Sequence, residues 1–417
     1  SLRSLQTPND KFSYGVVVQR SFQDAMISLL FNHNIQAVVV RYAPPYRSNY
    51  ITPLIKPYIE EVLKHDYSKK PETDLGPIIG ELIKQLRPEL DTYYVTDTSL
   101  GHLKDSTIKG FRRIFYQTED IQELHLTIMR GIAERYNTPF FSALVEYSQK
   151  PTGVFHAMPI SRGNSVFKSR WINDFGEFYG RNMFLAETSA TTGGLDSLLQ
   201  PTGPIKKAQE MARDAYGSLN TYFVTNGTST ANKIVMQALV KPDDVVFIDR
   251  DCHKSHHYGL VLAGAYPVYL DSYPIEEYSM YGAVPLEQIK TKLLRLKEAG
   301  RLDKVKMLLL TNCTFDGLVY NVERVMEEVL AIKPDMVFLW DEAWFAFAGF
   351  AYNYKQRTGM YTAKKLYGKY RSTNYRKKYN DHIKGLNNGD QSLLPDPDKV
   401  KIRVYSTQST HKTLSSF

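Results

Sequence analysis

Residues 406–414 read Ser-Thr-Gln-Ser-Thr-His-Lys-Thr-Leu and follow a short run at 402–405 that has the pattern of a buried strand. This order places Lys412 just beyond the carboxyl end of the predicted strand, which is where parallel sheets bind their ligands. A lysine sheltered in such a cleft loses part of its affinity for protons and becomes a better nucleophile towards an aldehyde. The alternative is a solvated surface lysine, which residue type alone favours.

The sequence before this string alternates short apolar runs with segments of helical length. Such alternation is typical of a parallel sheet that helices cover on both faces. The expected strands are 222–225, 245–249, 267–270, 306–311, 336–341 and 402–406, and the expected helices are 204–216, 229–240, 255–263, 286–299 and 322–332.

A second, smaller α/β unit is predicted for residues 1–115. Its expected strands are 14–18, 37–41, 92–95 and 113–116, and its expected helices are 22–32, 55–63 and 78–86. Residues 116–165 contain a predicted helix at 121–136 and then a segment punctuated by Pro and Gly, which we interpret as a linker. The remainder, 166–417, forms the larger α/β domain.

A possible phosphate site follows the predicted strand at 222–225. A glycine and three hydroxyl residues, Gly227, Thr228, Ser229 and Thr230, open the next predicted helix. Free backbone N–H groups and the positive end of a helix dipole bind phosphate at such a position. An ordinary helix cap is the alternative, and it is favoured when the string is considered alone.

An imidazole and a carboxylate follow two other predicted strands. His253, His256 and His257 have a spacing that could hold zinc, but no Cys or carboxylate cluster completes the site, so we expect no metal. A structural role is the alternative for His253.

Asp341 emerges from an apolar strand, where a carboxylate is costly unless it is paired. Its partner could equally be a Lys or Arg side chain or a nitrogen atom of a ligand.

Considered together, these four strand ends predict a site for pyridoxal phosphate. A phosphate site, an imidazole the size of the ring, a carboxylate for the ring nitrogen and a Schiff-base lysine occur in this chain order. No other common cofactor needs all four. The joint pattern therefore favours a functional role for Lys412 over a surface position.

Five strings make the prediction more specific: NGTSTANK (226–233), DRDCHKS (249–255), TNCTFDGLVYN (311–321), DEAW (341–344) and STHKTL (409–414). With them, nearly the whole chain resembles the bacterial-type Orn/Lys/Arg decarboxylases, pyridoxal phosphate enzymes of the aspartate aminotransferase fold (fold type I). The resemblance implies a receiver-like (flavodoxin-like) N-terminal wing domain at 1–115, a linker at 116–165 and a cofactor-binding major domain at 166–417.

The resemblance also implies residue roles. Lys412 would form the Schiff base with the cofactor, Asp341 would pair with the protonated pyridine nitrogen, and His253 would stack on the ring. Five further contacts are implied: Thr228, Ser229 and Ser409 on the phosphate, and Trp344 and His411 along the pocket, with His411 counted among the catalytic residues.

The activity implied is the decarboxylation of lysine, arginine or ornithine to the corresponding amine and carbon dioxide, in a homodimer or larger homo-oligomer. The sequence does not choose among these three substrates. Two alternatives stay open: a catalytically silent homologue that acts as a binding or scaffold subunit, and an aminotransferase.

Three features depart from the family pattern. His156-Ala-Met-Pro159 continues as Ile-Ser-Arg, where the family commonly has Gly and His. The span from Asp341 to Lys412 is 71 residues (412 minus 341), roughly twice the expected span, and it contains an insertion at about 355–400. Lastly, family members continue beyond the lysine, so we expect a major domain truncated at its C-terminal end and a chain that is a fragment or the ordered part of a longer protein.

The basic charge of the chain lies mainly within this insertion. Residues 355–384 contain ten Lys or Arg and one Asp, a net of +9, so the rest of the chain sums to 8 minus 9, or −1. Tyrosines lie between the basic residues, a pattern that could bind nucleic acid, but a solvated insertion loop is the favoured interpretation.

Composition narrows the class of protein further. With 43% hydrophobic residues in 417, the chain can bury a large core. Its apolar runs are far shorter than the roughly 18–20 residues that cross a bilayer. The chain start lacks the apolar core of a signal peptide, and Cys252 and Cys313 cannot build a disulfide framework, so we expect a cytoplasmic protein.

Overall fold

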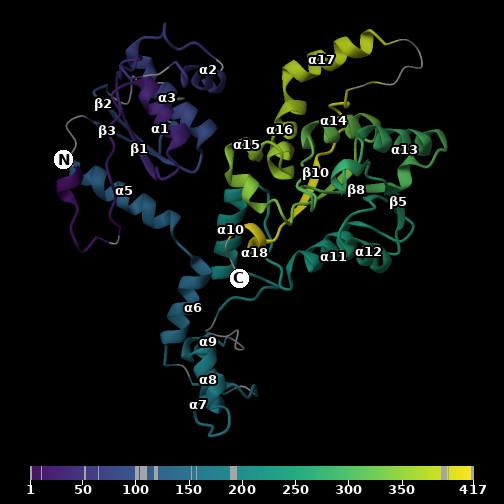
Figure 1. The fold of residues 1–417 in the computed structure, drawn as a ribbon, viewed down its shortest axis with the longest axis horizontal. Coiled ribbons are helices and arrows are strands. Elements are labelled where there is room, and N and C mark those ends of the chain that lie inside the picture. Colours follow the sequence, from purple (N-terminus) through teal and green to yellow (C-terminus); the bar gives the residue numbers. More distant parts are fainter. Residues whose placement is uncertain are drawn as a thin grey trace. The chain divides into compact units, whose positions relative to one another are not determined.

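The structure is a computed structural model in which the chain forms two compact units, Ser1–Lys150 and Pro151–Phe417 (Figure 1). It describes residues 2–10, 12–50, 53–63, 65–98, 103, 110–116, 121–151, 153–155, 157–187, 195–386, 392 and 394–414. Among the described helices, none combines the length and the apolarity that a bilayer crossing needs.

The first unit contains a three-stranded parallel sheet of order β1-β2-β3. Successive side chains of β2 point to opposite faces, so Tyr94 packs with helices α1 to α3 and Tyr93 packs with α5. The elements are η1 (Leu2–Leu5), α1 (Phe22–Phe31), β1 (Ala37–Arg41), α2 (Lys56–Leu63), α3 (Glu72–Leu86), β2 (Asp91–Thr96), β3 (Arg113–Tyr116), α5 (Ile121–Arg135) and α6 (Pro139–Gln149).

Two expectations for this region differ from the structure. Residues 14–18 form no strand, and Val17 and Val18 are 69% and 76% exposed, because a β-ladder needs a neighbouring strand and apolar character alone does not supply one. The segment interpreted as a linker contains α6, and α5 packs Leu124 and Ile128 on the first sheet. The domain limits themselves stay a prediction.

The second unit is built on a five-stranded sheet of order β10-β9-β8-β4-β5, in which every pair is parallel. The parallel register brings the carboxyl ends of the strands to one edge, with Asp341 of β9 paired to Thr311 of β8 and Thr407 of β10. The strands are β4 (Val245–Asp249), β5 (Tyr266–Leu270), β8 (Val305–Thr311), β9 (Val337–Asp341) and β10 (Arg403–Thr407).

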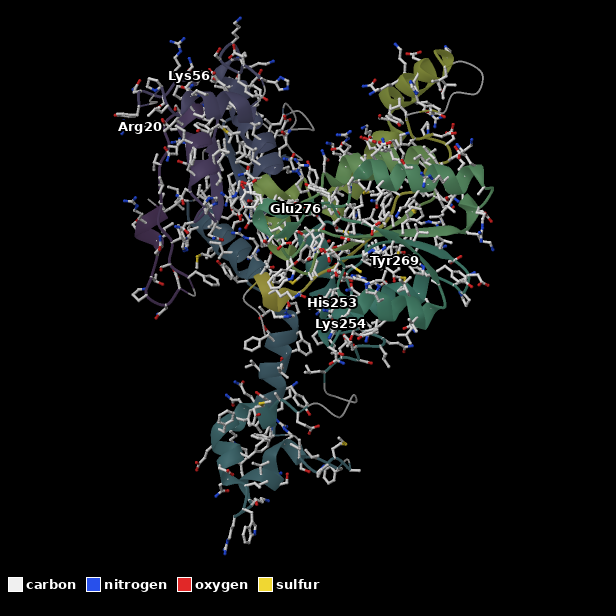
Figure 2. All side chains as sticks on the ribbon, turned by 45° about the vertical axis from the view of Figure 1, so that its right-hand side comes forward. Arg20, Lys56, His253, Lys254, Tyr269 and Glu276 are labelled. Carbon is white, nitrogen blue, oxygen red and sulfur yellow. The ribbon has the colours of Figure 1, made fainter. Side chains whose placement is uncertain are left out.

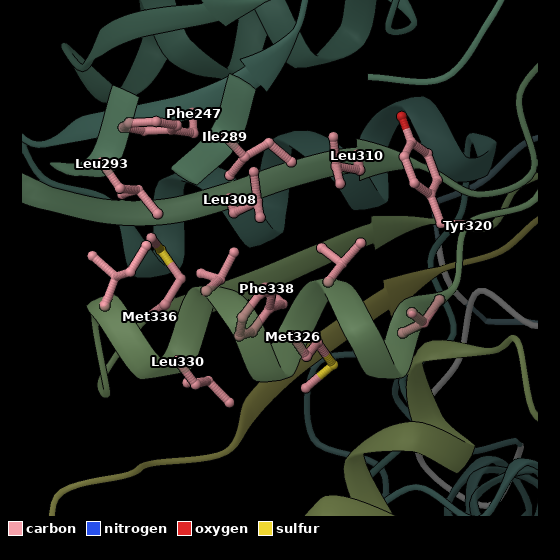
Figure 3. Packing of buried hydrophobic residues seen from close by; sticks show 14 of the residues in the cluster. Phe247, Ile289, Leu293, Leu308, Leu310, Tyr320, Met326, Leu330, Met336 and Phe338 are labelled. Atoms are coloured by element: carbon pink, nitrogen blue, oxygen red, sulfur yellow. The ribbon is translucent and has the colours of Figure 1, made fainter. Parts of the chain in front are cut away.

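Helices cover both faces of this sheet, as the sequence predicted (Figure 1). On one face α11 (Gly227–Leu239) and α12 (Lys254–Ala263) pack against Val246 and Ile248. On the other face α13 (Leu286–Glu298) and α14 (Val322–Ile332) pack against Phe247 and Phe338, and Figure 3 shows this cluster from close by.

The remaining elements of the second unit are mostly short. They are η3 (Ser161–Gly163), α7 (Asn164–Phe167), α8 (Asn173–Tyr179), α9 (Arg181–Leu185), α10 (Pro204–Tyr216), β6 (Pro274–Ile275), η4 (Glu276–Tyr278), β7 (Met280–Tyr281), η5 (Leu302–Lys304), η6 (Ala346–Phe350), α15 (Tyr352–Lys355), α16 (Gly359–Arg371), α17 (Thr373–Lys384) and α18 (Thr410–Thr413). The expected strand at 222–225 is absent, because this segment leads into α11 without a strand partner and Tyr222 is 74% exposed.

The basic insertion is helical, so its interpretation as a solvated loop was wrong. Leu366 and Tyr370 of α16 are buried in the same core as α14, and Lys365 pairs with Glu323 of α14 at 2.7 Å. Thr358 and Ser372 cap the two helices of the insertion, α16 and α17. The charge of α16 is therefore partly neutralised by acidic residues on α14.

Candidate active site

Asp341 is the last residue of β9, at the edge where the parallel strands end, and it is 3% exposed. Its Oδ2 accepts hydrogen bonds from His256 Nε2 at 2.7 Å and Asn232 Nδ2 at 3.1 Å, and its Oδ1 accepts one from the Ala343 N–H at 3.1 Å. Burial alone would raise the pKa of Asp341, but the hydrogen bonds from His256, Ala343 and Asn232 outweigh it and leave the pKa lowered. The carboxylate is therefore ionised.

A Lys or Arg partner for Asp341 was one of the two expected possibilities. Among the described residues, the recorded salt bridge of Asp341 is with His256, and no Lys or Arg pairs with it. An ionised buried carboxylate held by hydrogen bonds retains the capacity to take a further donor.

The start of α11 has the features expected of an anion site. Asn226 and Gly227 have φ angles of +67° and +72°, and the Asn226 side chain makes no capping hydrogen bond. The Thr228 hydroxyl, 7% exposed, hydrogen-bonds the hydroxyl of Ser409, 3% exposed, which directly precedes α18. Ser229 follows in the same turn and is half-buried. An uncapped helix start with two hydroxyls converging on it suits an anion.

Lys412 lies on α18 with its Nζ atom 4.4 Å from the centroid of the Trp344 ring. Trp344 comes three residues after Asp341 and is 42% exposed. Lys412 and the neighbouring His411 are also exposed, so the sheltered position expected for the lysine is not found in this chain alone. A cation over an indole face is attracted by the ring, which restricts where the amine can go.

His253 is the N-cap residue of α12, and Figure 2 labels it beside Lys254. Its Nδ1 accepts the Ser255 N–H at 3.2 Å and lies 2.8 Å from the Ser255 hydroxyl. Because a backbone N–H can only donate, the neutral ring carries its proton on Nε2. Partial burial lowers the pKa of His253, the charge of Asp341 opposes this, and His256, Lys412 and Lys254 lower it further. Lys412 is thus within electrostatic reach of the imidazole.

Two residues in this network were not predicted as site residues. Asn232 is 1% exposed and His256 is 0% exposed, and both bind Asp341. His256 had been considered only as a zinc ligand; among the described residues no group of His, Cys, Asp or Glu could hold a metal ion. A signal existed for Asn232, since it lies four residues after Thr228 and so on the same face of α11.

A cavity of about 210 Å³ opens beside the strand ends of β4 and β8. Phe315 lies in its wall and meets Trp344 edge-on, with ring centroids 6.1 Å apart. The Trp344 ring also contacts the amine of Lys412. The pair of Phe315 and Trp344 therefore connects the wall of the cavity with the lysine. The other lining residues are Asp249, Asp251, Ser272, Tyr281, Gly282, Thr311, Thr314 and Asp316.

One sequence feature lies outside the described residues. His156, in the string that departs from the family pattern, is not among them. The structure places Asp341 at the end of β9, Ser409 and Lys412 in the segment after β10, Thr228 in the first turn of α11 and His253 at the start of α12.

The fold and the strand-end residues define an α/β protein with a parallel sheet and a site built at its carboxyl edge. The chain matches the family model described as Orn/Lys/Arg decarboxylase, major domain, over residues 138–370. The chain belongs to this family, which confirms the resemblance, and its α/β fold is the one predicted.

Individual relatives agree with this assignment. The chain is 37% identical to the lysine decarboxylase LdcA of Pseudomonas aeruginosa over 67% of this chain and 33% of that protein. It is 30% identical to the inducible ornithine decarboxylase of Escherichia coli over 57% of this chain and 34% of that protein. The solved lysine decarboxylase A from Pseudomonas aeruginosa has a TM-score of 0.53 and 26% identity, and the match covers 95% of this chain and 47% of that chain. The chain thus spans less than half the length of these relatives.

Proposed function

We propose that this chain binds pyridoxal phosphate and belongs to a decarboxylase of lysine, arginine or ornithine. The observation that carries the proposal is Asp341, an ionised and buried carboxylate with no Lys or Arg partner among the described residues. A protonated pyridine nitrogen supplies the missing cation. Family membership and two relatives named as lysine and ornithine decarboxylases support the same reaction class.

The other residues at the strand ends fit the remaining parts of this cofactor. The first turn of α11 and the hydroxyls of Thr228, Ser229 and Ser409 would hold the phosphate. His253 offers a flat ring that its Ser255 contacts hold in one orientation. Lys412 offers the primary amine that the aldehyde needs, and Trp344 would line the pocket beside it with His411.

When bound, pyridoxal phosphate supplies an electron sink for the pair of electrons left on the α-carbon as the carboxylate departs. Asp341 keeps the proton on the pyridine nitrogen, because its lowered pKa leaves the carboxylate charged. Lys412 provides the attachment point and an amine that can carry a proton to the α-carbon. Trp344 limits the positions of that amine.

We also propose that the active protein is a cytoplasmic homo-oligomer. His253, Trp344 and Lys412 are open to solvent in the single chain, whereas a reaction of this type benefits from exclusion of water. Residues from a second subunit, or from sequence outside this chain, would complete the cover. Light scattering of the purified protein tests this, and a monomer that is fully active would contradict it.

The test of the function uses full-length protein and two variants. Wild type should show a visible absorbance band of lysine-bound cofactor and release carbon dioxide from lysine, arginine or ornithine. Lys412→Ala should lose both, while Lys401→Ala, which removes an exposed lysine before β10, should lose neither. A wild type without the absorbance band would contradict the cofactor assignment. A wild type that has the band but releases no carbon dioxide would favour a catalytically silent homologue.

A further inference from the structure

Asn232 joins three elements of the site through one buried amide. Its Nδ2 donates to Asp341 Oδ2 at 3.1 Å and to Ser255 Oγ at 3.0 Å. Its Oδ1 accepts from Thr407 Oγ1 at 2.6 Å. The residue lies on α11, and its partners belong to β9, α12 and β10. The hydrogen-bonding capacity of the amide N–H₂ group is therefore fully used.

The direction of every hydrogen bond in this network follows from donor chemistry. An ionised carboxylate only accepts, so the Asn232 amide must turn its N–H₂ group towards Asp341. The carbonyl oxygen of the amide then faces Thr407, whose hydroxyl must donate. Ser255 Oγ accepts from Asn232, so its own proton is free to point to His253 Nδ1 at 2.8 Å. The network has one consistent set of proton positions.

The same amide therefore reaches both groups that would meet the cofactor ring. One N–H holds Asp341 directly, and the other orients His253 through the Ser255 hydroxyl. Oδ2 of Asp341 also accepts His256 Nε2, so two donors occupy that oxygen and leave Oδ1, with its single bond from Ala343, for a ligand.

We propose that Asn232 is a positioning residue for the cofactor ring: it aims Asp341 at the ring nitrogen and, through Ser255, fixes the plane of His253 against the ring face. This inference rests on the proposed function. Removing the amide leaves the Thr407 hydroxyl without its acceptor, and it takes one donor from Asp341 and one from the Ser255 hydroxyl, which keeps His253. Asp341 then keeps the hydrogen bonds from His256 and Ala343 but loses the second donor to Oδ2, so Oδ1 is no longer the oxygen with clearly more room for a ligand.

The test compares two cofactors in the full-length protein. Pyridoxal phosphate has the ring nitrogen, and 1-deaza-pyridoxal phosphate carries a C–H group in its place. Dissociation constants are measured by fluorescence at equilibrium. Wild type should bind pyridoxal phosphate more tightly. In Asn232→Ala this preference should shrink by about tenfold, the size of one charge-assisted hydrogen bond. Gln237→Ala, which removes an exposed amide from the same helix, should keep the wild-type preference.

A second variant separates the two branches of the network. Ser255→Ala breaks only the route to His253, so it should weaken both cofactors alike and leave their ratio unchanged. If Asn232→Ala does not fold, Thr407→Val serves instead, since it removes only the hydroxyl that fixes the amide and should reduce the ratio to a smaller extent.

The outcomes are distinguishable. Equal weakening of both cofactors in Asn232→Ala, with the wild-type ratio intact, would mean a merely structural residue and would overturn the inference. A wild type that binds neither cofactor, or shows no preference for the ring nitrogen, would instead overturn the proposed function. If the ratio of the two dissociation constants falls as much in Ser255→Ala as in Asn232→Ala, the claim that Ser255 acts on His253 and not on Asp341 is refuted.

Discussion

His256 Nε2 lies 2.7 Å from Asp341 Oδ2, and neither side chain is more than 3% exposed. The pair joins two elements, with α12 supplying the imidazole and β9 the carboxylate. It replaces the Lys or Arg partner that buried carboxylates usually require. Because the imidazole donates a hydrogen bond and also fills space, the carboxylate is fixed in position while it can still accept a hydrogen bond from a ligand.

Replacing His256 should alter the stability of the protein and its dependence on pH. His256→Phe removes a hydrogen bond to a buried charge and should lower the free energy of unfolding by about 1–3 kcal/mol near neutral pH. The pKa of Asp341 is lowered from 3.8, so its contribution to stability is present above 3.8 and lost as pH falls through the folded-state pKa. Urea titrations at several pH values should show this loss in wild type and a weaker one in the variant. His257→Phe is the control, and identical acid profiles for His256→Phe and wild type would contradict the prediction.

Glu342, next to Asp341 in the chain, should show the opposite dependence on pH. It is 0% exposed and accepts hydrogen bonds from Ser406, Gln408 and the Gly359 N–H, yet burial raises its pKa. A raised carboxyl pKa means that wild-type stability falls as pH rises from the ordinary 4.5 through the folded-state value. Glu342→Gln lacks this ionisation and should gain on wild type as pH rises, by about 1.4 kcal/mol per unit of pKa shift. Parallel stability profiles for the two proteins would refute this.

The proposed phosphate contact of Ser409 can be separated from other effects by the choice of ligand. Ser409→Ala should weaken binding of pyridoxal phosphate by about tenfold, because it removes one hydrogen bond to a charged group. Binding of pyridoxal, which has no phosphate, should change little. Isothermal titration calorimetry measures both, with Gln237→Ala, which removes an exposed side chain from α11, as the control. Similar losses for the two ligands would place the effect in packing instead of phosphate recognition.

Two glycines of α16 should respond in opposite directions to alanine. A Cβ on Gly359 would lie 2.8 Å from Trp340 Cδ1, and this indole is buried, so Gly359→Ala should destabilise the domain by about 1–3 kcal/mol. A Cβ on Gly368 meets nothing within 4 Å, so Gly368→Ala should stabilise by about 0.5–1 kcal/mol through helix propensity. Urea denaturation measures both changes. A neutral Gly359→Ala would contradict the close approach of Gly359 to Trp340.

The three inner strands of the larger sheet, β4, β8 and β9, could be predicted closely because each is a mainly apolar run whose residues are mostly buried. Val337–Asp341 and Val305–Thr311 begin and end within one residue of the prediction. The segment at 222–225 has the same composition, but a strand also needs a partner, and composition says nothing about which neighbours are available.

Several features of the site could not be predicted in the same way. Asn232 and His256 are polar residues inside helices, and polar helix residues are usually exposed to solvent; the packing of α11 and α12 on the sheet and on each other buries these two. The insertion was predicted to be a solvated loop because most of its residues are charged or polar. The signals for buried helices, the apolar residues Leu366 and Tyr370 and the capping residues Thr358 and Ser372, were not given weight. The roles assigned to Lys412, His253, His411 and the phosphate-binding residues stay predictions.

The hydroxyl pair of Thr228 and Ser409 joins positions 181 residues apart, and the bond from Thr407 to Asn232 spans 175. Both depend on β10 and the turn after it, which a ribosome would deliver long after α11. A growing chain that has made α11, α12 and β9 therefore lacks the hydroxyls that bond to Thr228 and Asn232. Cofactor binding of the proposed kind would therefore have to wait until β10 and α18 have been made.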